Sequence, residues 1–93
     1  MIIEPSQIKG TKFLVPKGRA KAVQKALFKC DYGYELNFDK DFSLRKIQGE
    51  SAFFVDHQGL ITFIRRDDCE SEKEFMGDFY RETEEEINYE CLF

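Results

Sequence analysis

The sequence predicts a small α+β domain in which an antiparallel sheet packs on one main helix and an acidic segment follows. Segments rich in β-forming residues stand on both sides of a single amphipathic stretch. A short loop that contains glycine joins two apolar runs, as in a hairpin. Ten Phe and four Tyr supply large apolar side chains for a core in a chain of 93 residues. The expected order is β-α-β-β-β and then a C-terminal acidic helix, in a single domain over residues 1–93.

The first strand and the main helix are predicted between residues 11 and 30. Thr11–Val15 is rich in β-forming residues. Pro16 ends this strand because it has no backbone N–H for the ladder. From Lys17 to Lys29, apolar residues recur at helical spacing on one side and lysines four residues apart form the opposite stripe. We therefore expect a helix with one buried and one basic face. The apolar stripe consists of Ala20, Val23, Leu27 and Cys30.

Two further strands are expected after this helix. Tyr34–Phe38 alternates apolar and polar residues, which is typical of a half-buried strand. Asp39–Asp41 is polar and has the composition of a turn. Phe42–Ile47 is interpreted as a short strand.

The clearest hairpin joins Ser51–Val55 to Leu60–Ile64. Its loop, Asp56–Gly59, ends in a glycine, which supplies the positive φ that short hairpin loops require. Both arms are apolar enough to be buried in a core.

The C-terminal part allows two interpretations. Ser71-Glu72-Lys73-Glu74 matches a capping box at the start of a helix. One interpretation is a single helix from 72 to about 89, although Gly77 inside it costs about 1 kcal/mol relative to alanine. The other is a short helix that ends at Gly77, a strand at 79–83 and a helical turn at 84–87.

Charge is divided unevenly along the chain. Residues 1–29 carry seven cationic side chains and one carboxylate, whereas residues 30–93 carry seven and seventeen. The formal net charge of −4 therefore combines +6 with −10. Such a split bears on partners and encounter rates rather than on fold. The candidate basic face consists of Lys17, Arg19, Lys21, Lys25 and Lys29. The candidate acidic face consists of Asp67, Asp68, Glu70, Glu74, Asp78, Glu82, Glu85 and Glu86.

The sequence offers no spacing typical of catalysis or of a metal site. Cys30, Cys69 and Cys91 are odd in number and contain no C-x-x-C, so we expect reduced thiols in a cytoplasm. They and His57 lack the spacing of metal ligands. We expect no enzyme activity, no metal and no cofactor. The N-terminus has no signal-peptide pattern, and no apolar run approaches the roughly 20 residues that cross a bilayer.

Two segments together resemble a group of small, uncharacterised bacteriophage accessory proteins. Arg19–Phe28, followed by Tyr32-Gly33-Tyr34, matches the K-x-V-Q-x-x-L-F…G-Y stretch of that group. Phe54–Thr62 matches its F-V-D-x-x-G-x-I-T hairpin. The ending at Arg81–Ile87, after a conspicuous Phe75, is also similar. In that group the ending is a strand and a helical turn, which favours the broken interpretation of the C-terminal part.

The resemblance covers most of residues 11–87 but departs from the group at Cys30-Asp31 and in its basic helix face. It implies a phage-encoded protein that acts in the host cytoplasm on a host defence or metabolic protein. Its motifs mark a helix face and a hairpin and carry no chemistry, so they do not define a mechanism.

The leading hypothesis is therefore a non-enzymatic inhibitor or modulator that works by protein–protein contact, with acidic nucleic-acid mimicry as one mode. The alternative is binding of RNA or single-stranded DNA through the helix at 17–29, with Phe28, Tyr32 and Tyr34 stacking on bases if they are exposed. A third hypothesis is an anion site at Lys17–Arg19 in front of the helix. An exposed sheet edge leaves a homodimer open.

Overall fold

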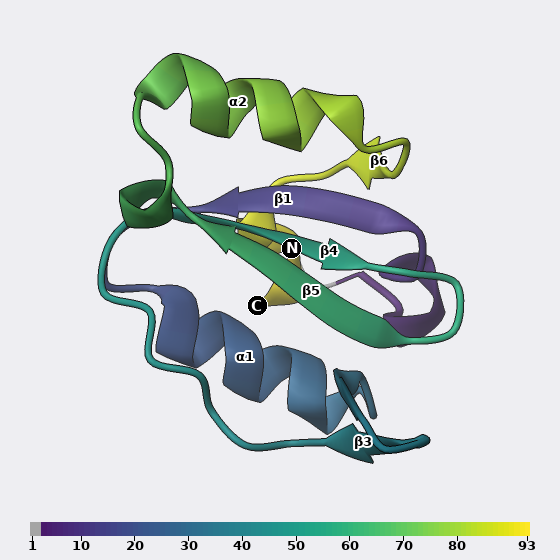
Figure 1. Ribbon diagram of the computed structural model, residues 1–93. Coiled ribbons are helices and arrows are strands. Elements are labelled where there is room, and N and C mark those ends of the chain that lie inside the picture. The colour runs from purple at the N-terminus through teal and green to yellow at the C-terminus, as the bar shows by residue number, and fades with distance from the viewer. Residues whose placement is uncertain (1–2) are drawn as a thin grey trace.

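The computed structural model describes residues 3–93 and has two helices on opposite faces of one sheet (Figure 1). The helices are α1 (Ala20–Lys29) and α2 (Glu72–Arg81). The strands are β1 (Thr11–Val15), β2 (Gly33–Leu36), β3 (Asp39–Asp41), β4 (Ser51–Val55), β5 (Leu60–Arg65) and β6 (Glu85–Glu86). Short 3-10 helices lie at Pro5–Gln7, Arg66–Asp68 and Tyr89–Leu92. The predicted α+β class is confirmed.

The strands lie in the order β3-β2-β5-β4-β1-β6. The centre, β1-β4-β5, is antiparallel, and the predicted hairpin at residues 51–64 forms two of its strands. The pairs β2–β5 and β1–β6 are parallel, which the expectation of an antiparallel sheet did not include. They are parallel because a helix precedes each of β2 and β6. Each helix carries the chain back to the end of the sheet at which the strand before it, β1 or β5, began.

The two helices cover opposite faces because the chain crosses the sheet in opposite directions. The connection β1-α1-β2 moves toward the β3 edge, whereas β5-α2-β6 moves toward the β6 edge. Crossovers between parallel strands are right-handed in nearly all proteins. Two crossovers of the same hand that run in opposite directions place their helices on opposite faces.

The sheet separates two cores. Phe13, Leu27 and Phe53 belong to the core under α1, whereas Phe54 and Phe79 belong to the core under α2. Successive side chains of a strand point to opposite faces, so neighbouring residues of β4 serve different cores. All five residues of β4 are buried, which explains why this segment is continuously apolar apart from its first residue.

Each of the two interpretations of the C-terminal part is only partly right. Ser71 caps α2 as expected, with its side chain accepting a hydrogen bond of 3.1 Å from the Glu74 backbone N–H. The helix continues through Gly77 to Arg81 because Phe75 and Phe79, one turn apart, are both fully buried. It then gives way to β6 and a 3-10 helix. Among residues 3–93, no helix is both long and apolar enough to span a membrane.

The predictions for residues 34–47 are wrong in detail. The expected strand 34–38 ends at Leu36, and the segment Asp39–Asp41, expected to be a turn, is strand β3. The chain turns at Asn37 and Phe38. Phe42–Ile47 is not a strand.

Candidate protein-interaction surface

A tight hairpin turn places Phe38 at the tip of β2 and β3. Its two loop residues, Asn37 and Phe38, have φ values of 48° and 69°. Two-residue loops with positive φ at both positions match the twist of the strands, and they favour Asn followed by Gly. Here phenylalanine stands in the position that favours glycine. A residue with a Cβ in this left-handed conformation costs roughly 1–2 kcal/mol.

The Phe38 side chain is not buried, so no burial energy offsets this backbone cost. Its relative exposure is 108%, the highest among the exposed large apolar residues. Leu36, Phe42 and Leu44, in the same part of the chain, are also exposed. Backbone strain that persists in a native protein concentrates at functional sites. The hairpin tip is therefore the strongest candidate site on the molecule.

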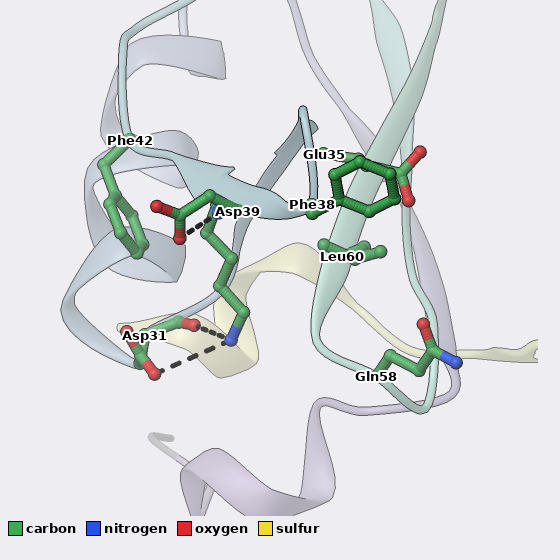
Figure 2. Close-up of a pocket in the computed structure, with 8 residues that line it drawn as sticks. Asp31, Glu35, Phe38, Asp39, Phe42, Gln58 and Leu60 are labelled. Atoms are coloured by element: carbon green, nitrogen blue, oxygen red, sulfur yellow. Dashed lines mark hydrogen bonds and ion pairs between the residues drawn. The ribbon is translucent and has the colours of Figure 1, made fainter.

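A hollow of about 530 Å³ lies beside Phe38, and we call it the hairpin pocket. Its lining consists of Asp31, Glu35, Phe38, Asp39, Lys40, Phe42, Gln58 and Leu60. Figure 2 shows these side chains, with Phe38 and the Glu35 carboxylate on the same side of the hairpin near Leu60. The volume lies within the range of about 300–1,000 Å³ that ligand pockets occupy.

Part of this pocket is on a face of the sheet that α2 leaves open. Tyr34 and Ile61 face α1, so their strand neighbours Glu35 and Leu60 face the other way. On that second face α2 packs on β4 and its neighbours, through contacts of Phe75 and Phe79 with the core. The β2–β3 end of the sheet lies away from α2 (Figure 1). The helix therefore covers only part of its face.

The charge of the hairpin pocket is negative. Lys40 is engaged by Asp31, whose backbone oxygen accepts a 2.7 Å hydrogen bond and whose carboxylate lies 3.6 Å from Lys40 Nζ (Figure 2). Glu35 and Asp39 form no ion pair with any residue of the described range 3–93. Within residues 3–93, the Asp39 carboxylate accepts one hydrogen bond, from Lys40 N at 2.8 Å. Two carboxylates are therefore left for a partner.

The segment after β3 is fixed by a buried side chain rather than by a strand. The Gln24 carboxamide accepts a 2.7 Å hydrogen bond from Arg45 N and donates one of 3.0 Å to Arg45 O. It also accepts a 2.6 Å hydrogen bond from the Tyr34 hydroxyl. Gln24 is fully buried on α1. Its amide takes the place of a neighbouring strand at Arg45, in a segment that is not part of the sheet.

Polar contacts around Asp41 hold the base of the hairpin. Asp41 accepts hydrogen bonds from the Ser43 hydroxyl at 2.7 Å and the Ser43 N–H at 3.0 Å, and pairs with Arg45 at 2.9 Å. The Ser43 hydrogen bond and the Arg45 guanidinium lower the pKa of Asp41. The Arg45 guanidinium also lies 4.2 Å from the centre of the Tyr34 ring.

The predicted basic face lies on the α1 side of the molecule. Its five residues are exposed, and none forms an ion pair within residues 3–93. They are Lys17, Arg19, Lys21, Lys25 and Lys29. The aromatic residues beside this face do not suit stacking on bases. Tyr32 and Tyr34 are buried, and Phe28 is half-buried against Tyr34 and Phe42. Burial raises the pKa of Tyr34 strongly.

The predicted acidic residues lie on α2 and the segments that flank it. Those at its start and along it are Asp67, Asp68, Glu70, Glu74 and Asp78, and those after it are Glu82, Glu85 and Glu86. Arg65 and Arg81 neutralise part of this set, at 3.4 Å from Asp68 and 3.1 Å from Asp78. Because α1 and α2 are on opposite faces of the sheet (Figure 1), the lysines of α1 lie away from the carboxylates of α2, whereas Asp67 lines a hollow together with Lys17 and Lys21.

The cysteines are free thiols and are not gathered with His57. Potential ligand atoms of Cys69, Glu74 and Asp78 lie within 4.8 Å of one another, a grouping that the sequence did not indicate. Burial, and to a lesser degree the charges of Glu74 and Asp78, raise the pKa of the Cys69 thiol. This opposes the thiolate form that binds metals.

In comparisons with known proteins, no family model, no curated protein and no solved structure matches this chain. The fold and the surface define a small α+β domain with a strained, exposed hairpin tip. The resemblance to bacteriophage accessory proteins remains a prediction.

Sequence reasoning did not find the hairpin pocket. Phe38 fitted the alternation of a strand, and Asp39 was assigned to a turn. A signal that was present is Asn37, a residue type that tolerates the left-handed conformation, between two segments of strand length.

Proposed function

We propose that this protein is a non-enzymatic binding module that contacts another protein through Phe38 and the hairpin pocket. The observation that carries the proposal is a fully exposed phenylalanine held in a left-handed turn position. Large aromatic side chains supply much of the energy of protein interfaces when a partner's pocket encloses them. In this proposal the contact inhibits or redirects the partner, as the resemblance to bacteriophage proteins implies.

The lining of the hairpin pocket supports binding rather than nucleophilic catalysis. It offers carboxylates, an amide, one amine and apolar groups, but no hydroxyl, thiol or imidazole. Covalent catalysis by such groups requires a nucleophile with a base beside it. The Lys40 amine is already hydrogen-bonded to Asp31.

The charged faces have a supporting role in this proposal. Unpaired lysines along α1 and carboxylates along α2 give the molecule a positive and a negative side. Charges at the rim of an interface mainly raise the association rate and orient the partners. Substitutions there should change the rate of binding and its salt dependence more than the lifetime of the complex.

Affinity capture with a matched control tests the proposal. Phe38→Gly removes the ring and restores the residue type that the turn favours, so the fold is retained. Phe93→Ala removes another exposed aromatic ring, outside the hairpin. The proposal expects a protein that is retained by wild type and by Phe93→Ala and lost by Phe38→Gly. Equal retention by Phe38→Gly, or no stoichiometric partner of the wild type in the lysate of its host cell, would contradict it.

A second candidate function is nucleic-acid binding along α1, which the five unpaired cations favour. Filter binding in low salt tests it with Lys21, Lys25 and Lys29 all replaced by alanine. This variant should lose affinity and about one unit of salt slope for each phosphate contact removed. Unchanged binding would rule out α1 as the site. Because Tyr32 and Tyr34 are buried and do not suit stacking on bases, nucleic-acid binding has less support than protein binding through Phe38.

A further inference from the structure

We infer that the hairpin pocket recognises a basic side chain, arginine or lysine, that stands next to an apolar residue in the partner protein. This inference rests on the proposed function and names the chemistry of its partner. Three properties of the pocket carry it: its charge, the aromatic ring at its edge and its apolar floor.

The charge of the pocket selects a cation. Among its lining residues are three carboxylates and one amine, and the amine is engaged by Asp31. Glu35 and Asp39 retain negative charge with no cationic partner in the described chain, residues 3–93. A guanidinium or ammonium group beside Phe38 would pair with Glu35, whereas Asp39 is opposite Leu36 in the β2–β3 ladder and faces the other side of the sheet. An acidic side chain would meet the like charge of Glu35 instead.

The Phe38 ring offers the same cation a second contact. Arginine and lysine are attracted to the face of an aromatic ring within about 6 Å of its centre. This protein already uses such contacts, since Lys12 Nζ lies 4.7 Å from the centre of the Phe79 ring and Arg45 lies over Tyr34. Figure 2 shows the Phe38 ring and the Glu35 carboxylate on one side of the hairpin.

The apolar part of the pocket accommodates the rest of the partner segment. Leu60 is half-buried on the face that α2 leaves open, and Phe42 is 45% exposed. The long stems of lysine and arginine pack on apolar surface while their charged ends remain polar contacts. An apolar residue beside the basic one would contact Leu60, since Phe42 packs against Phe28 on the α1 side.

A second copy of the chain fits this end of the sheet poorly. Strand β3 is an edge strand of only three residues, Asp39-Lys40-Asp41. If two copies paired antiparallel about Lys40, each Asp39 would face Asp41 of the other copy, and the two lysines would face each other. Like charges directly opposite one another destabilise strand pairing. Short, charged edge strands are a common protection against such pairing.

The test uses an acetylated, amidated peptide of alternating arginine and leucine as the probe, and a glutamate–leucine peptide as its matched control. Both are titrated into the ¹⁵N-labelled full chain and followed by amide chemical shifts. We expect saturable shifts at Glu35, Phe38 and Leu60 with the basic peptide only. Glu35→Gln should weaken this binding about threefold, the loss of one exposed ion pair. Asp67→Asn/Glu70→Gln, two exposed carboxylates near the start of α2, should leave it unchanged.

Several outcomes would overturn the inference. They are an absence of shifts at the hairpin, an equal response to the acidic peptide, and binding that is lost in the Asp67/Glu70 variant instead. Concentration-dependent shifts at the hairpin without peptide, together with a dimer in sedimentation, would identify a second copy as the occupant. If Glu35→Gln captures a partner as well as wild type does while Phe38→Gly loses it, the proposed function stands and this inference fails.

Discussion

At the scale of the residue, Phe38 combines a conformational cost with complete exposure. Folding gains neither core burial nor a favourable backbone from it. A side chain that stabilises nothing in the free protein is best explained by what it contacts in a complex. The same position therefore gives a prediction about stability that is independent of any partner.

Phe38→Gly should raise the free energy of unfolding by about 1 kcal/mol. The left-handed position costs a residue with a Cβ roughly 1–2 kcal/mol, and glycine avoids this cost. Part of the resulting gain in stability is offset because glycine has more conformational freedom to lose from the unfolded chain. Urea unfolding measures the difference. A variant that is less stable than wild type would show that the ring does contribute to the fold.

Lys12 is the opposite case, a cation used for structure. It is 5% exposed, and its Nζ donates hydrogen bonds of 2.7 and 2.8 Å to the carbonyls of Phe79 and Glu82 at the end of α2. Lys12→Met should lower the free energy of unfolding by about 1–3 kcal/mol, because these carbonyls lose their partner. Lys9→Met, at an exposed lysine, is the control and should change stability by less than about 0.5 kcal/mol. Equal effects of the two changes would refute the role of Lys12.

Asp41 makes a prediction about pH. Because the Ser43 hydroxyl and Arg45 lower its pKa in the folded state, Asp41 stabilises the fold above its ordinary value of 3.8. That contribution is lost as the pH falls through the lowered, folded-state pKa. Carboxyl ¹³C titration should place the midpoint of Asp41 below 3.8 in wild type and higher in Ser43→Ala. An identical midpoint in both proteins would exclude the hydroxyl as the main cause.

At the scale of the element, the link between α1 and the segment after β3 decides how firmly the hairpin pocket is held. Gln24 spans this gap, with hydrogen bonds to the Arg45 backbone and the Tyr34 hydroxyl. Arg45 in turn pairs with Asp41, at the end of β3. The hairpin is therefore fixed to the main helix through side chains rather than through further strands.

Gln24→Met keeps the size and shape of the side chain but removes its polar contacts. We expect a loss of about 1–3 kcal/mol of stability, because buried groups lose their partners. Hydrogen exchange at the Arg45 amide should accelerate more than exchange within β4. Gln48→Met, at an exposed glutamine of the same segment, should do neither. Unchanged exchange at Arg45 would mean that other contacts hold this segment.

The elements that the sequence predicted well are those with a strong local signal. The apolar stripe of α1, the hairpin around Gly59 and the Ser71 cap are all visible in residue spacing and type. The turn at Phe38 was missed because phenylalanine contradicts the turn signal. The segment 42–47 was assigned to a strand because its partner, a glutamine side chain, cannot be recognised from a local pattern.

At the scale of the whole molecule, the site depends on what the helices leave uncovered. The helices α1 and α2 lie on opposite faces because the two crossovers run in opposite directions, which neither composition nor periodicity reveals. The open end beside Leu60 exists because α2 packs over β4 and away from β2 and β3. That the lysines of α1 and the carboxylates of α2 lie on opposite faces of the sheet is visible only in the tertiary structure.

The most direct test of the central claim measures stability and partner affinity on the same Phe38→Gly protein. Urea unfolding gives the first quantity, and calorimetric titration with the partner recovered by affinity capture gives the second. If Phe38 is held exposed for binding, the free energy of unfolding should rise by about 1 kcal/mol while the affinity falls at least about thirtyfold, the loss of an interface residue worth 2 kcal/mol or more. A variant that binds the partner as tightly as wild type, whatever its stability, would contradict the claim.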